Sequence, residues 1–365
     1  MHEHPEEYFN LTMSVRSIAV VLAVLLASTA SSHAASFDCA KPARAIERVV
    51  CGDARLSAAD SAMAAAYRAD LPRLSSAGIG LLRADQVQWL AWTQQVCNVD
   101  EPQHTKAAAC LSPLYTDRTR QLLSAVTVLD GLTLLKRTQF LATPVKPDEA
   151  HGSPQMPGFG TLQASWPRAD SDDPAWIAWS AALEAHMLKM AGAGEEQGTA
   201  MGKRKLPFAW VDDMAEAQDT TLEAHLRSVE NGRVSAMLTA GGMGHGAAHP
   251  FESSETMTWL LDAKRTLRAS DVFTDDGWKD VVGGLCWDQL QKWDGKQYLF
   301  PQVDGPDAAD LQKVIANPAN WTLEHDGLHI SYPDYTIAPR VAQPEDAVLP
   351  WAELKQVLAP GFVRP

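Results

Sequence analysis

Four of the five cysteines lie between residues 39 and 110, in two closely spaced pairs: Cys39 with Cys51, and Cys97 with Cys110. Disulfides that close short loops restrict the unfolded chain, so these pairs constrain the fold more than any other feature of the sequence. The sequence alone allows several connectivities, of which sequential pairing is the simplest. The fifth cysteine, Cys286, has apolar neighbours, and we expect it to be a buried thiol.

The residues around and between these pairs carry the spacing of helices. From residue 57 to 74 apolar side chains recur every three or four positions and alanines fill most of the rest, with Ser57 as the predicted N-cap. The same period resumes from 82 to 97, and a third helix is predicted from about 106 to 123. Three short helices bury little apolar surface. The pattern therefore predicts an all-α N-terminal module that its disulfides staple together.

The order and spacing of these residues resemble a known family. The resemblance lies in residues 37–39, 46–51, 56–60, 65–68, 83–90 and 110–118. Together they are similar to the N-terminal domain of LprI-type lysozyme inhibitors over about residues 37–123. Thr93, Gln94 and Gln95 replace the arginine and acid that commonly precede the third cysteine of that family. The resemblance implies a helical domain, here residues 35–126, that binds lysozyme.

The first 34 residues have the pattern of a signal peptide. A short basic start around Arg16 precedes an apolar run at 18–26, and residues 32–34 (Ser-His-Ala) give the small-x-small motif of a cleavage site. Met13 is an alternative start, because three acidic residues precede the basic segment. The pattern predicts cleavage after Ala34 and a periplasmic or secreted protein, in which cysteine pairs form disulfides. An uncleaved anchor is the alternative, but the apolar run is shorter than the roughly 20 residues that span a bilayer.

The net charge of −14 bears on the partner. Residues 35–365 hold 42 acidic and 30 basic side chains, which leaves −12 after cleavage. Such a charge disfavours nucleic acid and suits a basic protein partner, although acidity also serves solubility. No segment after the N-terminus is apolar enough to predict a membrane span in the mature form.

A second domain is predicted beyond residue 157. Residues 124–142 are apolar and compatible with either a helix or a strand, and the prolines and glycines that follow predict a linker, placed at 127–157. In residues 158–365 the patterns predict a strand from 159 to 166 and a helix after Asp173. Two further strands are predicted on either side of an Asn231-Gly232 turn. Mixed helices and antiparallel strands of this kind indicate an α+β domain.

This half also resembles a known family. The similar stretches are residues 234–249, 270–273, 327–339 and 349–355. They resemble the C-terminal domain of RsiV-type anti-sigma factors over about residues 205–360, with Arg340 where that family commonly has an aromatic residue. That domain also occurs beside polysaccharide deacetylase modules. The resemblance implies lysozyme binding, whereas anti-sigma activity is not implied, because no sigma-binding segment precedes the domain.

Few residues indicate chemistry. His245 and His249 are four residues apart, a spacing that can begin a zinc site on a helix, but the surrounding glycines favour a structural turn or a binding loop. Acidic clusters at 170–173 and 212–213 lack the spacing of calcium loops. No motif of a nucleophile, a phosphate-binding loop or a cofactor is present. We therefore predict neither metal nor cofactor, and no enzymatic activity.

The sequence thus predicts an exported, two-domain binding protein that inhibits lysozyme by occluding its cleft. The candidate contact residues are His245, His249, Tyr332, Tyr335, Arg340 and Arg118, the last with packing as the alternative role. The alternative function is an envelope protein that binds peptidoglycan or assists a cell-wall enzyme. Two further alternatives are a hydrolase with unrecognised carboxylates and an exported pair of domains that binds another ligand.

Overall fold

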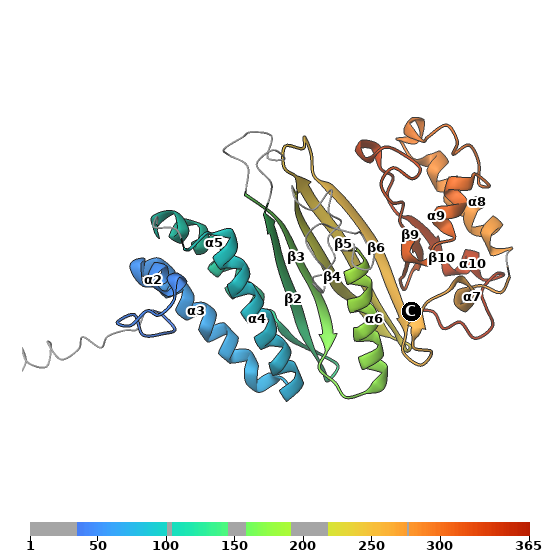
Figure 1. Ribbon diagram of the computed structural model, residues 1–365. Coiled ribbons are helices and arrows are strands. Elements are labelled where there is room, and N and C mark those ends of the chain that lie inside the picture. Colours follow the sequence, from blue (N-terminus) through green and yellow to red (C-terminus); the bar gives the residue numbers. More distant parts are fainter. Residues whose placement is uncertain (1–34, 101–103, 145–157, 191–217, 276) are drawn as a thin grey trace, which may run out of the picture.

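The computed structural model describes residues 35–100, 104–144, 158–190, 218–275 and 277–365. They form an N-terminal group of helices, a seven-stranded sheet with one helix on it, and a smaller C-terminal unit of helices and a three-stranded sheet. Figure 1 shows the large sheet between the N-terminal helices and the C-terminal unit. Each of the three parts contains its own cluster of buried apolar side chains.

The N-terminal helices confirm the predicted helical module. They are α2 (Ala45–Gly52), α3 (Ala54–Asp70), α4 (Ser76–Val96) and α5 (His104–Leu123). The predicted N-cap was wrong: Asp53 caps α3 and accepts the backbone N–H groups of Arg55 and Leu56. Ser57 lies inside the helix, where its hydroxyl donates to the Val50 carbonyl at 2.6 Å.

The core of this module is aromatic at its centre. Trp89 and Tyr115 are buried and meet edge to face, with ring centroids 5.0 Å apart. Such a pair adds about 0.5–1.5 kcal/mol beyond the area that it buries. Both disulfides have formed in the sequential pairing, with S–S distances of 2.04 Å for Cys39–Cys51 and 1.98 Å for Cys97–Cys110.

The large sheet has the strand order β1-β2-β3-β4-β5-β6-β7. Its strands are β1 (Val126–Leu129), β2 (Leu132–Pro144), β3 (Phe159–Ala169), β4 (Gln218–Glu230), β5 (Arg233–Gly244), β6 (Phe251–Leu260) and β7 (Arg265–Thr266). Neighbouring strands are antiparallel except β3 and β4, which are parallel. The predicted Asn231-Gly232 turn is confirmed, and both residues have the positive φ that a tight hairpin requires (50° and 71°).

The predicted linker at 127–157 was partly wrong. Residues 126–144 form β1 and β2, which continue the helical module directly into the sheet, and residues 145–157 lie outside the described part of the chain. These residues form strands because β2 has partners along both of its edges. A lone hairpin is unstable in water, but here β2 pairs with β3 along one edge, and α4 covers the part of the other edge that β1 leaves open.

Helix α4 covers the open edge of β2 with polar side chains. Asp85 accepts the backbone N–H of Thr138 at 3.0 Å, and the Gln95 amide donates to the Ala142 carbonyl at 3.2 Å. Gln95 is one of the residues at which this sequence differs from the family that it resembles, and here its side chain binds the edge of β2. Unpaired edge groups otherwise invite pairing with another chain.

One face of the sheet packs against helix α6 (Pro174–Met190), the helix predicted after Asp173. Trp179, Leu183 and Met187 of the helix are fully buried against the sheet, where Trp166 of β3 is also fully buried. The C-terminal unit touches the sheet at β6, where the Thr256 and Thr322 hydroxyls lie 3.3 Å apart.

The C-terminal unit is built around three aromatic rings that contact one another. Phe273 lies parallel to Trp278 at 4.6 Å between centroids, and Trp321 meets both edge-on at 5.5 Å. The unit contains α7 (Ala269–Val272), α8 (Trp278–Lys292), α9 (Ala309–Ile315), β8 (Trp321–Leu323), β9 (Gly327–Ile330), β10 (Ala347–Pro350) and α10 (Trp351–Leu354). Cys286 of α8 is buried with a free thiol, as predicted.

These features confirm the predicted fold class, a disulfide-stapled helical region followed by a mixed region with antiparallel strands. Among the described residues, no helix is both long and apolar enough to cross a membrane.

Candidate functional site

Most of the predicted contact residues lie in two loops, 241–250 and 332–340, which meet where Arg340 contacts Pro250, 90 residues away in sequence. Arg340 joins them. Its guanidinium donates to the Pro250 carbonyl at 3.1 Å and lies 3.3 Å from the Glu252 carboxylate, both at the start of β6. It also pairs with Asp334 in its own loop at 3.2 Å. One arginine therefore fixes the 332–340 loop against the end of the large sheet.

A shallow recess lies between the two loops. It has a volume of about 270 Å³ and is lined by Glu252, Ser253, Ser254, Tyr332, Pro333, Asp334 and Arg340. Two carboxylates face a single guanidinium there, so the recess is acidic overall. Glu252 and Asp334 were missed by sequence analysis, which had no signal that the start of β6 would meet the loop before β10.

Exposed apolar side chains surround this recess. Tyr335 is 61% exposed and Val341 is 96% exposed, while Met243 and Phe251 are partly exposed at the ends of β5 and β6. Tyr335 also has a φ of +59°, which is uncommon for a residue with a Cβ and marks a tightly specified loop. We call Met243, Phe251, Tyr335, Val341 and Arg340 the loop surface.

Two of the predicted contact residues are turned inward. The Tyr332 ring is 6% exposed and packs beside Cys286; burial raises the pKa of Tyr332 far above its usual range, and raises that of the Cys286 thiol to about 12. The His245 side chain is 7% exposed, with Nε2 3.4 Å from the Asp219 carboxylate. His249 is exposed on the loop, and its Nδ1 lies 3.1 Å from the Pro250 carbonyl.

In the described part of the chain, no group of three or more potential metal ligands occurs around the histidines or elsewhere. The glycine-rich segment is not a free turn, because β5 continues through it to Gly244. At Gly242 a Cβ would lie 2.5 Å from the Asp219 carbonyl, so glycine allows the close approach of β4.

Arg118 was predicted to contact a partner, with packing as the alternative, and its burial favours packing. It is 2% exposed, and its guanidinium donates to Gln86 Oε1 and Thr138 Oγ1, both at 2.9 Å. It also lies over the Phe140 ring, 5.6 Å from the centroid. Burial lowers the pKa of Arg118 to about 10, partly offset by the charge of Asp85. Arg118 holds α5 on the edge of the sheet.

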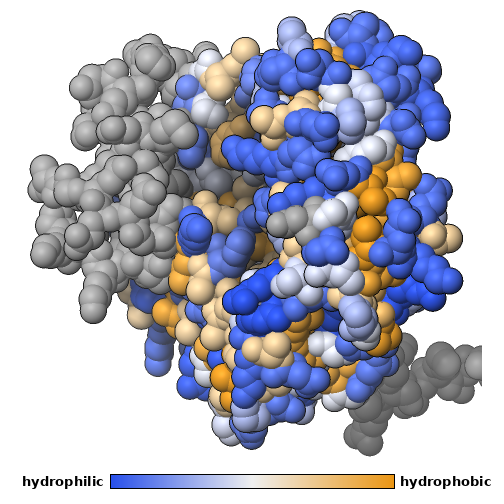
Figure 2. All heavy atoms as spheres, turned by 90° about the vertical axis from the view of Figure 1, so that its right-hand side faces the viewer, coloured by the Kyte–Doolittle hydropathy of each residue, from blue (hydrophilic) through white to orange (hydrophobic). Residues whose placement is uncertain are grey.

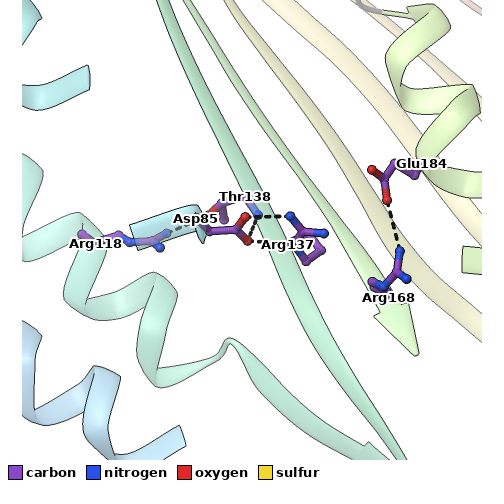
Figure 3. Close-up of polar contacts among 6 residues, drawn as sticks. All are labelled: Asp85, Arg118, Arg137, Thr138, Arg168 and Glu184. Atoms are coloured by element: carbon purple, nitrogen blue, oxygen red, sulfur yellow. Dashed lines mark hydrogen bonds and ion pairs between the residues drawn. The ribbon is translucent and has the colours of Figure 1, made fainter. Parts of the chain in front are cut away.

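Next to Arg118 lies a buried ion pair that sequence analysis missed. The Asp85 carboxylate accepts Arg137 Nη2 at 2.8 Å and Nε at 3.0 Å. Figure 3 shows Arg118, Thr138, Asp85 and Arg137 in one row across β2, with the Arg168–Glu184 pair on the far side. A signal existed: Asp85 falls on the same helical face as Leu82 and Trp89, where a carboxylate needs a partner.

The C-terminal unit presents a mostly hydrophilic surface. Figure 2, which looks at the molecule from that side, shows predominantly hydrophilic side chains, with a strip of hydrophobic ones among them. Residues 267–365 contain 15 acidic and eight basic side chains, a net charge of −7. Residues 35–126, by contrast, contain nine acidic and ten basic ones.

Comparison with protein families identifies two regions of the chain. Residues 39–122 match the family described as lysozyme inhibitor LprI, and residues 270–352 match a family described as protein of unknown function, DUF3298. The chain therefore carries an LprI domain and a DUF3298 domain. No curated protein matches the chain. The resemblance to RsiV-type domains stays a prediction.

Solved structures of DUF3298 family proteins are also similar. The protein from Bacteroides fragilis NCTC 9343 is 15% identical, with a TM-score of 0.44 over 63% of this chain and 94% of that chain. The one from Pseudomonas aeruginosa PAO1 is 16% identical, with a TM-score of 0.44 over 65% of this chain and 98% of that chain.

The LprI domain supports a lysozyme-inhibitor-like function and suggests a non-catalytic protein. The two disulfides and this domain are consistent with an extracellular or periplasmic location.

Proposed function

We propose that the protein is exported, as its N-terminal sequence predicts, and inhibits lysozyme by occupying its cleft. The observation that carries this proposal is the LprI match, which begins at the first cysteine and covers helices α2, α3 and α4, nearly all of α5, and both disulfides. A match that includes the complete stapled module supports inheritance of its binding role, not merely a shared helix.

In this proposal, the negative charge of the chain beyond the LprI region favours association with basic lysozyme. The region from 127 to 365 contains 33 acidic and 20 basic side chains, a net charge of −13, whereas the LprI region is close to neutral. The field of the larger region attracts a basic enzyme, and such steering raises association rates at low salt. We therefore expect the association rate to fall as salt is added, with a smaller change in the dissociation rate.

The loop surface supplies a second contact in this proposal. Tyr335 and Val341 project from a loop that Arg340 ties to β6, so little conformational freedom is lost when they bind. Lysozyme works with two carboxyl groups in a cleft. An exposed aromatic ring on a fixed loop can fill such a cleft without any chemistry by the inhibitor.

The test uses oxidised protein comprising residues 35–365 and chicken-type lysozyme. Cell-wall clearing and direct binding are measured at two salt concentrations, and we expect clearing to fall with stoichiometric inhibitor and binding to weaken at high salt. Unchanged clearing in large excess at low salt would refute the proposal. Retention of the protein on insoluble peptidoglycan, with no effect on lysozyme, would favour the envelope-binding alternative.

Two matched variants locate the interface. Tyr335→Ser with Val341→Ser alters the loop surface, and Val87→Ser alters a 62% exposed valine on α4 in the LprI domain. All three side chains are exposed, so neither variant should change the free energy of unfolding by more than about 0.5 kcal/mol. Inhibition lost only in the loop variant assigns the contact to the C-terminal region, and the opposite result assigns it to the helices.

A further inference from the structure

A buried carboxylate lies beside the predicted start of the mature chain. Asp60 of α3 is 3% exposed and accepts the backbone N–H of Ser36 at 2.6 Å. The residue before it, Ala35, is 4% exposed and packs into the core of the N-terminal helices. The first described residues are therefore part of the core and lie next to Asp60.

Asp60 has no cationic partner within the described residues. Among them, its one hydrogen bond comes from Ser36, and no Lys, Arg or His side chain pairs with it. Its charge is felt nearby, since burial and then Asp60 raise the pKa of Tyr115. A carboxylate removed from water with one neutral donor is unfavourable unless a positive charge offsets it.

There is room for such a charge beside Asp60. A partly enclosed hollow of about 160 Å³ is lined by Ser36, Phe37, Asp60, Met63 and Tyr115, among others. The bond lengths of the backbone place the nitrogen of Ala35 within about 3.7 Å of the Ser36 nitrogen. The Ser36 nitrogen is 2.6 Å from an Asp60 oxygen, so the Ala35 nitrogen lies within about 6.3 Å of that oxygen.

We propose that cleavage between Ala34 and Ala35 completes this site by creating an ammonium group that pairs with Asp60. Hydrolysis by a signal peptidase adds one water across the peptide bond, leaving a carboxylate on Ala34 and an amine on Ala35. The amine takes up a proton at neutral pH, because a free α-amino group has a pKa of about 7.7–8.0. The neutral amide of the unprocessed chain offers no such charge.

Processing would then stabilise the folded protein. Since Ala35 is buried, the new terminus becomes part of the core of the N-terminal helices. The proposed pairing rests on the export element of the proposed function, but it concerns stability and does not depend on lysozyme binding.

A double-mutant cycle tests the pair. Four proteins are compared by urea unfolding: the chain beginning at Ala35, the same chain preceded by Gly-Ser, and both with Asp60→Asn. We expect the extension to raise the unfolding constant at least tenfold in the parent and less than about twofold in the Asp60→Asn background, where the carboxylate charge is gone. Asp38→Asn, at an exposed carboxylate nearby, is the matched control and should leave the effect of the extension unchanged.

The pH dependence gives a second measurement. Pairing raises the amine pKa in the folded state, so the stabilisation is present below about pH 7.7 and is lost as pH rises through the raised value. Arg44 and Glu47, which line the same hollow, pair with each other at 2.8 Å.

If Asp60→Asn does not fold, the rate of acetylation of the Ala35 amine replaces the double-mutant cycle. We expect at least tenfold protection in the folded protein relative to the urea-unfolded chain.

Equal stability of the processed and extended chains, or an exported protein whose first residue is not Ala35 by mass spectrometry, would overturn the proposal. Lysozyme clearing is measured on the same samples. Coupling without inhibition supports the ammonium site and counts against the proposed function, whereas inhibition without coupling overturns the ammonium site alone.

Discussion

Removing Arg137 should loosen the attachment of the helices to the sheet, because it leaves Asp85 buried without its cation. The side chains of Arg137 and Asp85 are 7% and 3% exposed and share two hydrogen bonds of 2.8 and 3.0 Å. Breaking one partner of a buried pair costs about 3–5 kcal/mol. Arg137→Met keeps much of the side-chain volume, so the cost comes mainly from the uncompensated carboxylate.

The assay is urea unfolding of the oxidised protein, followed by tryptophan fluorescence. A loss of 3–5 kcal/mol corresponds to roughly 10²- to 10³-fold or more in the unfolding constant, since about 1.4 kcal/mol is tenfold. Two controls bracket the result. Arg120→Met breaks an exposed pair with Asp117 and should cost less than about 1 kcal/mol, and adding Asp85→Asn to Arg137→Met should restore much of the stability.

A cost below about 1 kcal/mol for Arg137→Met would refute this account of the interface between the helices and the sheet. So would a double variant as unstable as the single one, because the penalty would then lie in lost packing over Trp166, whose ring centroid is 5.9 Å from the Arg137 guanidinium carbon. Pure packing loss should not be rescued by removing the charge of Asp85.

Three further predictions concern stability. Replacing Cys97 and Cys110 together by serine should cost about 3 kcal/mol in urea unfolding, the loop entropy expected for a separation of 13 residues, whereas an unchanged midpoint would show that α4 and α5 hold this end unaided. Asp170→Ala should cost about 1–2 kcal/mol, because the carboxylate accepts the Ser75 N–H at 2.6 Å at the start of α4; Asp172→Ala is the exposed control. Asp271→Asn should flatten the acid limb of stability: hydrogen bonds from Arg265 lower the pKa of Asp271, so its contribution is present above the unfolded pKa and is lost as pH falls through the lowered value.

The sequence predicted individual helices and the hairpin well, but it did not predict which elements pack against one another. Period and turn residues located α4, α5, α6 and the β4–β5 hairpin, since each depends on residues close in sequence. The boundary of α3 was wrong because Asp53 competes with Ser57 as a cap, and only the backbone geometry decides between them.

The linker prediction failed for a different reason. Whether the apolar stretch at 124–142 is a helix or a strand depends on pairing with β3, which follows residue 157 in the chain. The candidate site likewise combines residues that local sequence indicated with residues that only long-range packing places there. The segments carrying Arg340 and Pro250 were each singled out, whereas Glu252 and Ser254 were not, because their place in the recess depends on the packing of the C-terminal unit on β6.

The position of α4 unites these observations. Its buried face supplies Trp89 to the helical core and Asp85 to the buried ion pair. Its exposed Gln95 donates to the edge of β2, and Asp170 from the sheet region accepts the backbone N–H of the N-cap residue Ser75. Gly78 permits that contact, because a Cβ there would lie 2.8 Å from the Asp170 carboxylate. The LprI domain of this chain is therefore packed onto the sheet and shares polar contacts with it. Cutting the chain after residue 126 would expose an apolar strand edge and remove the cation of Asp85, so an interface in the helices is better sought with surface substitutions in the intact protein than with isolated domains.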